Sequence, residues 1–182
     1  MMNREKLTHI LRAVASVSNA RSFVVVGSAT VLLTSKNIPA AMLMTNEIDV
    51  YSPDSPDEEL FSDLIEGSLG PGSQFAKTFK YYADGVTSKT ATMPSDWPSR
   101  ARTVDIATLE GILVLVPDIN DIALAKTVAW REKDQEWLCA GVRSLILDPA
   151  KMQSRLAKLS PRDLPWPEIE RRKKTIFAYK SA

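Results

Sequence analysis

Residues 23–51 read FVVVGSATVLLTSKNIPAAMLMTNEIDVY, and this stretch sets the architecture that we expect for the chain. Its first residues, Phe23–Val26, are apolar and mostly β-branched, which is typical of a short buried strand. Gly27 and Ser28 follow and predict a tight turn. The residues after this turn, up to Asn37, favour a short helix. The expected order is therefore strand, turn and helix.

A second strand is predicted over residues 42–51. Successive side chains of a strand point to opposite faces of its sheet. Glu47, Asp49 and Tyr51 should therefore share one face, while the apolar residues between them occupy the other. The two carboxylates are expected to point the same way.

Hydrophobic periodicity and turn residues predict the remaining elements. The first is a helix over residues 3–18, and the second is a helix that is capped by Asp57 and broken within residues 67–72. A hairpin is predicted over residues 79–93, with Asp84-Gly85 at its turn. Two strands are predicted at residues 101–107 and 112–116, around Glu110-Gly111. After these come helices over residues 119–138, capped by Asp118, over residues 137–147, and from Pro149 and Pro167.

These elements predict one domain of the α/β (α+β) class over residues 1–182. Residues 1–117 would hold the first helix and a mixed β-sheet of about five or six strands flanked by helices. Residues 118–182 would form a helical C-terminal third. With 45% hydrophobic and 25% charged residues, the composition is that of a globular protein and excludes intrinsic disorder.

The chain has one cysteine and one histidine, which limits the kinds of catalytic and metal site that it can form. Because Cys139 is the only cysteine, an internal disulfide and a cysteine metal cluster are excluded. Because His9 is the only histidine, a catalytic triad and a zinc hydrolase site are disfavoured. Any metal would be bound by oxygen atoms, which favours Mg²⁺ or Mn²⁺. No apolar run approaches a membrane span and the N-terminus lacks the apolar stretch of a signal peptide, so we expect a cytoplasmic protein with no membrane partner.

Charge is unevenly distributed along the chain. Residues 46–66 contain eight acidic and no basic residues, whereas residues 151–182 contain nine Lys or Arg against three Asp or Glu. Solvated helix faces explain both runs, and the alternative is a metal site beside a tail that binds nucleic acid or a protein partner.

The order apolar strand, Gly27-Ser28, helix and Glu47-Ile48-Asp49 resembles the signature of the nucleotidyltransferase superfamily. The segments KYYADGVTSKTATMPSDW and PDINDIALAKTVAWREKD strengthen the likeness. They resemble a bacterial family of this fold with poorly assigned function, similar to abortive-infection and toxin–antitoxin nucleotidyltransferases. The most specific piece includes Lys126, Lys133 and Asp134.

The resemblance implies an enzyme that moves a nucleoside monophosphate from an NTP to an acceptor hydroxyl on RNA, tRNA or protein. It implies that Glu47 and Asp49 bind Mg²⁺ or Mn²⁺ and that Gly27 and Ser28 approach the phosphates. Lys126 and Lys133, seven residues apart on one predicted helix, would neutralise phosphate charge. A toxin or defence role, with a cognate antitoxin as partner, belongs to the same implication.

The sequence departs from the superfamily signature in two ways, and it leaves two candidates for the third acidic residue of the site. Glu47 stands where the superfamily usually has Asp, and eighteen residues separate Ser28 from Glu47, more than is common. The third carboxylate is Asp105, within an expected edge strand, or Asp134, which we favour because it lies in the resembling stretch. The competing hypothesis is a non-catalytic binding module or antitoxin with a degraded site.

Overall fold

The computed structural model describes residues 1–106, 109, 111–159 and 165–179. Its helices are α1 (Arg4–Ser18), α2 (Val31–Thr34), α3 (Glu58–Leu69), α4 (Gln74–Phe79), α5 (Ile119–Ala129), α6 (Glu132–Arg143), α7 (Pro149–Arg155) and α8 (Trp166–Ala178). Its strands are β1 (Ser22–Val26), β2 (Glu47–Tyr51), β3 (Tyr82–Gly85), β4 (Arg102–Val104) and β5 (Leu113–Val116). Short 3₁₀ helices are η1 (Ser28–Thr30), η2 (Ala40–Leu43), η3 (Trp97–Arg100) and η4 (Leu156–Lys158). No described helix combines the length and apolar character that crossing a bilayer requires.

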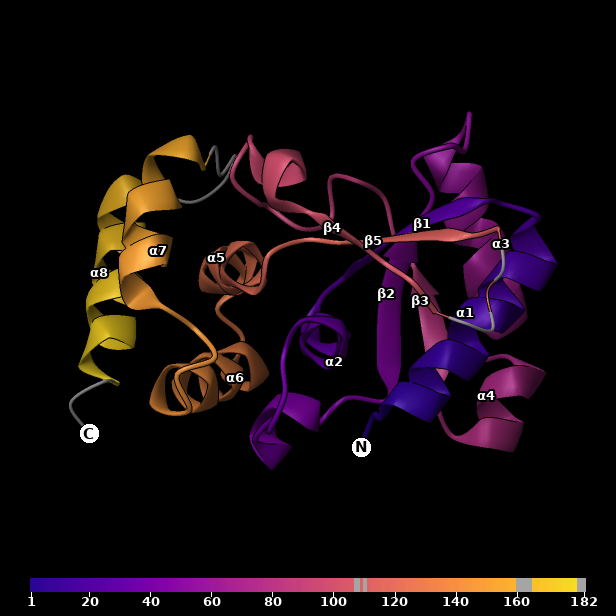
Figure 1. The fold of residues 1–182 in the computed structure, drawn as a ribbon, viewed down its shortest axis with the longest axis horizontal. Coiled ribbons are helices and arrows are strands. Elements are labelled where there is room, and N and C mark those ends of the chain that lie inside the picture. The colour runs from indigo at the N-terminus through magenta and orange to yellow at the C-terminus, as the bar shows by residue number, and fades with distance from the viewer. Residues whose placement is uncertain (107–108, 110, 160–164, 180–182) are drawn as a thin grey trace.

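The five strands form one mixed sheet in the order β3-β2-β1-β5-β4. β1 is central and runs antiparallel to β2 and parallel to β5, while β2 and β3 are parallel. The predicted α/β class with a mixed, helix-flanked sheet and helices toward the C-terminus is confirmed. Figure 1 shows the sheet with α1, α3 and α4 on the right and helices α5 to α8 on the left.

Two apolar cores lie on the two faces of the sheet. Phe23 and Val25 of β1 pack with α1 and α3, whereas Val24 and Val26 pack with α5 and α6. Since side chains alternate along a strand, a central strand that is covered on both faces must be apolar throughout. All five residues of β1 are buried, which explains the unbroken apolar run in the sequence.

Several sequence-based boundaries are correct. α1 begins after Asn3, whose side chain accepts the backbone N–H of Lys6, and α3 begins after Asp57, which accepts that of Leu60. Asp118 likewise caps α5. Pro149 and Pro167 lie in the first turns of α7 and α8, where a missing N–H costs nothing.

Two predicted elements are wrong. The hairpin at Asp84-Gly85 does not form, because both residues belong to β3, which pairs with β2 and follows the unpredicted helix α4. The long helix over residues 119–138 is interrupted at Trp130, which adopts the left-handed conformation with φ 56° and ends α5. Strands β4 and β5 occur where expected, although Ala107 and Glu110 lie outside the described residues.

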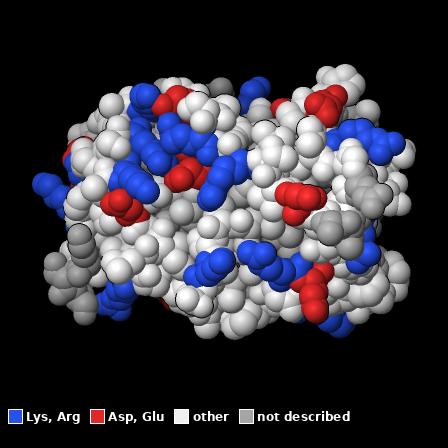
Figure 2. Space-filling view, in the orientation of Figure 1, with Lys and Arg blue, Asp and Glu red and all other residues white. Residues whose placement is uncertain are grey.

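The basic C-terminal stretch is largely paired within the structure. In α8 Arg171 and Arg172 both bond Glu168, and Arg172 also donates to the carbonyls of Thr127 and Val128. These contacts agree with the solvated-face reading of that part of the run; residues 160–164 and 180–182 lie outside the described residues. Figure 2 shows Lys and Arg gathered beside Asp and Glu on the side of the C-terminal helices.

A buried carboxylate ties several of the C-terminal elements together. Asp121 of α5 has no exposed side-chain surface and accepts hydrogen bonds from Arg100 of η3 at 3.0 and 3.1 Å and from Arg155 of α7 at 3.1 Å. Arg155 also bonds Asp118 at 2.7 Å. Both guanidinium groups are mostly buried, so water screens these ion pairs only weakly.

We expect Asp121→Ala to lower the free energy of unfolding by about 1–3 kcal/mol, because it removes the buried carboxylate that two mostly buried guanidinium groups share and leaves Arg100 with Asp96 alone and Arg155 with Asp118 alone. Urea unfolding followed by circular dichroism measures this change. Asp63→Ala, at an exposed position of α3, is the matched control and should change stability by less than about 0.5 kcal/mol. Equal effects of the two substitutions would contradict a structural role for the Asp121 network.

Candidate active site

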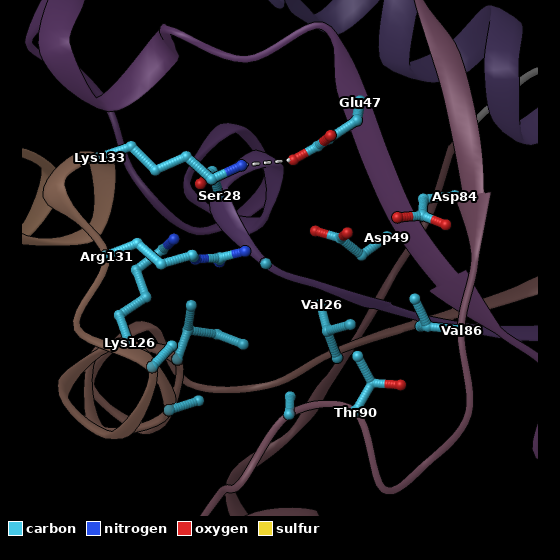
Figure 3. Close-up of a pocket in the computed structure, with 15 residues that line it drawn as sticks. Val26, Ser28, Glu47, Asp49, Asp84, Val86, Thr90, Lys126, Arg131 and Lys133 are labelled. Atoms are coloured by element: carbon cyan, nitrogen blue, oxygen red, sulfur yellow. Dashed lines mark hydrogen bonds and ion pairs between the residues drawn. The ribbon is translucent and has the colours of Figure 1, made fainter. Parts of the chain in front are cut away.

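A cavity of about 370 Å³ lies between strands β1 to β3 and helices α5 and α6. Carboxylates from β2 and β3 line one side, and basic side chains from the end of α5 and the start of α6 line the other (Figure 3). The Gly27-Ser28 turn contributes to the same cavity. The sheet register explains the acidic side.

Strand pairing places two acidic residues side by side across the sheet. Val26 of β1 pairs with Asp49 of β2, and Asp49 pairs with Asp84 of β3. Glu47 lies two residues before Asp49 on the same strand face, so all three carboxylates line the cavity. This row of Glu47, Asp49 and Asp84 is called the acidic row below.

Glu47 is held by two partners. Its Oε2 accepts a hydrogen bond from the hydroxyl of Tyr82 at 2.8 Å, and its Oε1 lies 3.1 Å from Nζ of Lys133. Burial opposes ionisation of Glu47, but the contacts with Tyr82 and Lys133 outweigh it and hold the pKa below its usual value. Burial and the hydrogen bond to Glu47 raise the pKa of Tyr82 to about 12.

Asp49 has a different environment. No hydrogen bond or ion pair joins its carboxylate to another described residue, and protein atoms surround most of it although it still borders the cavity. Burial, then the negative charges of Glu47 and Asp84, raise the pKa of Asp49 to about 7. Lys126 and Lys133 favour the charged form of Asp49 through space, but neither contacts its carboxylate.

The turn after β1 requires glycine for two reasons. Gly27 has φ 72° and ψ −160°, a backbone conformation that side chains rarely tolerate. A Cβ atom at Gly27 would also lie 1.7 Å from Oδ2 of Asp49. The missing side chain therefore leaves the space that the Asp49 carboxylate occupies, and it exposes the backbone of the turn to the cavity.

A buried ion-pair cluster supports the basic side of the cavity. Asp134 of α6 has no exposed side-chain surface; its Oδ1 lies 2.8 Å from Nζ of Lys126, and its Oδ2 accepts the Nε of Arg131 at 2.8 Å. Lys126 also lies over the ring of Trp137, 5.1 Å from its centroid. Burial lowers the pKa of Lys126 in spite of the nearby Asp134. Asp134 thus fixes the positions of two cations that line the cavity.

The structure brings together six of the seven residues predicted from the sequence. Those that line the cavity are Gly27, Ser28, Glu47, Asp49, Lys126 and Lys133. Lys126 and Lys133 reach it from two successive helices, α5 and α6, and do not share one helix face as predicted.

Asp134, chosen from the sequence for the remaining acidic role, does not line the cavity. Its carboxylate is fully buried against Lys126 and Arg131, so its position corresponds to a support for these cations. The other candidate, Asp105, is exposed just after the edge strand β4 and away from the cavity.

Sequence reasoning missed Asp84, Arg131 and Tyr82. Asp84 was assigned to a turn because Asp-Gly is a strong hairpin signal. Its alternation with Tyr82, in the manner of Glu47 and Asp49, is the signal that could have placed it on a strand. Arg131 lies inside the resembling stretch but beside a helix break that the sequence does not mark.

A model of the family described as "Nucleotidyltransferase of unknown function (DUF6036)" matches residues 5–180. No curated protein and no solved structure matches this chain. All the residues that line the cavity fall inside the matched range.

We expect Gly27→Ala and Gly67→Ala to change stability in opposite directions. An alanine Cβ at Gly27 would overlap the Asp49 carboxylate in a strained backbone conformation, so the free energy of unfolding should fall by about 1–3 kcal/mol. Gly67 lies inside α3 with open space around it, so alanine there should raise stability by about 0.5–1 kcal/mol. Urea unfolding of both variants tests this; a gain from Gly27→Ala would contradict the close approach.

A second expectation concerns Asp49 in metal-free buffer with a chelator. Its pKa of about 7 in the folded chain exceeds the value of about 3.9 in an unfolded one. The folded state therefore binds the extra proton, and its stability falls as pH rises from about 4 to 7. Asp49→Asn removes this loss. The stability gained by Asp49→Asn should grow by about 2 kcal/mol between pH 5 and pH 8.

Unfolding curves at several pH values measure that gain. Asp105→Asn, at an exposed position, provides the control and should show no such trend. A gain for Asp49→Asn that stays constant over this pH range would show that Asp49 ionises normally.

Proposed function

The chain belongs to the DUF6036 family of nucleotidyltransferases of unknown function, and on this premise we propose that it transfers a nucleoside monophosphate from an NTP to an acceptor hydroxyl. The observation that carries the proposal is the cavity in which the acidic row faces Lys126, Arg131 and Lys133. In this reaction the acceptor oxygen bonds to the α-phosphorus, the bond to the β-phosphate oxygen breaks, and pyrophosphate leaves.

The basic residues are assigned to the triphosphate. Lys126 and Arg131 are held by Asp134 and offer fixed positive charge, whereas Lys133 is about half exposed and can exchange Glu47 for a phosphate oxygen. Gly27 and Ser28 border the same space, and their backbone can approach a phosphate closely because Gly27 has no side chain. Substrate charge would thereby be neutralised on the side opposite to the acidic row.

The acidic row is assigned to Mg²⁺ or Mn²⁺. The chemistry of its oxygen atoms suits these ions, and the carboxylate of Asp49 has a raised pKa and no described cation in contact with it, so an added cation would stabilise its charged form. Such an ion would screen the triphosphate and orient the attacking and leaving oxygens. Glu47, Asp49 and Asp84 would hold the ion, which makes Asp84, and not Asp134, the third acidic residue of the proposal. An acidic residue of the row would also accept the proton of the acceptor hydroxyl.

RNA, tRNA or a protein is the acceptor class in this proposal. The support is the likeness of three segments of the chain to abortive-infection and toxin–antitoxin nucleotidyltransferases, which also suggests a toxin or defence role with a cognate antitoxin. Incubation with each labelled NTP, Mg²⁺ or Mn²⁺, and either total tRNA or a bacterial protein extract tests the transfer and its acceptor together. Label on neither class of acceptor contradicts the enzymatic proposal.

One observation favours a second candidate, a non-catalytic nucleotide-binding module or antitoxin. Over residues 1–106, 109, 111–159 and 165–179, no three acidic, histidine or cysteine side chains are arranged to hold a metal ion as they stand. Glu47 must leave Lys133 before it can bind an ion. Nucleotide binding without any transfer of label would support this second candidate.

Lys133→Ala should weaken NTP binding about tenfold, because a charge-assisted contact with a phosphate contributes about 1.5–3 kcal/mol. Its side chain is 54% exposed, so the melting temperature should change little. Lys126→Ala is less informative, since Lys126 is buried against Asp134 and its loss should lower stability as well. Titration calorimetry of wild type and Lys133→Ala with each NTP and Mn²⁺ measures the effect.

Lys173→Ala is the matched control, because Lys173 lies on α8 and pairs with Glu170 away from the cavity. Its NTP affinity should equal that of wild type. Equal affinities of wild type and Lys133→Ala would contradict the assignment of Lys133 to the triphosphate.

A further inference from the structure

The cavity has an apolar half that the phosphate and metal assignments do not use. Figure 3 shows Val26, Val86 and Thr90 on the side of the cavity away from Lys133 and Glu47. The apolar residues that line the cavity are Val26, Val86, Ala91, Ile122, Ala125 and Ala129. They come from β1, from the segment after β3 and from α5. We call these six residues the apolar slot.

The shape of the apolar slot suits a flat ring. Ala125 and Ala129 are four residues apart on α5, so their methyl groups lie on one face of the helix and form a wall without long side chains. Lys126, next to Ala125, carries the positive charge assigned to the triphosphate. A ligand that fills the cavity therefore needs anionic groups at one end and an apolar planar group at the other.

On the basis of the proposed function, we propose that the apolar slot binds the nucleoside of the NTP and selects the nucleobase by shape, without reading its hydrogen-bonding edge. Among the described residues that line the cavity, none is Asn, Gln or His, and every charged side chain belongs to the acidic row or the basic side. The slot therefore offers stacking and apolar contact as its main interactions with a base.

The hydroxyl of Thr90, beside the slot, already accepts a hydrogen bond within the chain. Oγ1 of Thr90 accepts the backbone N–H of Thr87 at 3.2 Å, and the backbone N–H of Thr90 donates to the carbonyl of Thr87 at 3.0 Å. These bonds close a turn within residues 87–90. The turn therefore uses the backbone N–H of Thr90 and one acceptor site of its hydroxyl, which reduces what Thr90 can offer to a base edge.

Selectivity among bases should therefore be small. Sites built to hydrogen-bond a substrate reject analogues by about 10⁴–10⁵, whereas apolar pockets discriminate by about 10–200-fold. We expect the affinities of ATP, GTP, CTP and UTP, measured with Mn²⁺ by titration calorimetry, to fall within about 100-fold of one another. A preference of 1,000-fold or more for one base would overturn selection by shape.

A substitution in the apolar slot distinguishes binding of the nucleoside from binding of the phosphates. Ala125→Leu places a larger side chain in the slot, so the affinity for every NTP should fall about tenfold or more, while inorganic tripolyphosphate with Mn²⁺ should bind as it does to wild type. Ala150→Leu, at an exposed position of α7, is the matched control and should change neither affinity. Circular dichroism confirms that each variant is folded.

The tripolyphosphate measurement distinguishes the two proposals. If wild type binds neither tripolyphosphate nor any NTP, the proposed function fails. If tripolyphosphate binds but every NTP binds no more tightly, or Ala125→Leu leaves NTP affinity unchanged, the charged half is correct and the apolar slot is not the nucleoside site. Loss of NTP affinity alone in Ala125→Leu supports the slot.

Discussion

Repulsion among the carboxylates of the acidic row is the interaction around which the site is built. Glu47, Asp49 and Asp84 face one cavity on adjacent strands. Burial and nearby carboxylates raise the pKa of Asp49 and of Asp84, whereas Tyr82 and Lys133 hold that of Glu47 below its usual value. A tyrosine and a lysine contact Glu47, but no described residue forms a hydrogen bond or ion pair with the carboxylate of Asp49. The sheet brings the charges together because Asp49 pairs with Asp84 in register. In the proposed function, Mg²⁺ or Mn²⁺ would offset this repulsion.

On the opposite, basic side of the cavity, several positively charged side chains lie close together and repel one another. Asp134 accepts hydrogen bonds from both Lys126 and Arg131, so one buried carboxylate offsets the repulsion between them. The break at Trp130 makes this possible, because it turns the chain between α5 and α6 and lets Arg131 and Lys126 approach the same carboxylate. Lys133, outside this cluster, keeps the freedom to exchange partners.

The parts of the site that depend on contacts between residues close in the sequence could be predicted, and those that depend on contacts between distant residues could not. Alternation along one strand is local, so Glu47 and Asp49 could be paired from sequence, and the caps at Asn3, Asp57 and Asp118 are local as well. Asp84 reaches the site through pairing with β2, a contact between distant residues that overrides the local preference of Asp-Gly for a turn.

The helix break was hidden for a similar reason. Trp130 occupies a left-handed position that usually takes glycine, so the local sequence predicted a continuous helix. The burial of Asp134 between Lys126 and Arg131 depends on that break, so the sequence, which placed Asp134 in the site by its position in the resembling stretch, did not predict its burial. The residue types of the site were visible in the sequence, but their partners were not.

Asp121 and Asp49 are both largely enclosed by protein, but their surroundings differ in a way that distinguishes a structural aspartate from a candidate functional one. Asp121 is enclosed by Arg100 and Arg155, so its charge is balanced within the fold. Asp49 faces Glu47 and Asp84, lies against a glycine whose missing Cβ makes room for it, and borders an open cavity. The chain thus surrounds one buried aspartate, Asp121, with two arginines but places no such partner in contact with Asp49. Glu47 and Asp84 instead add negative charge beside Asp49, and Lys126 and Lys133 act on it only through space. The proposed Mg²⁺ or Mn²⁺ ion would supply the cation that contacts it.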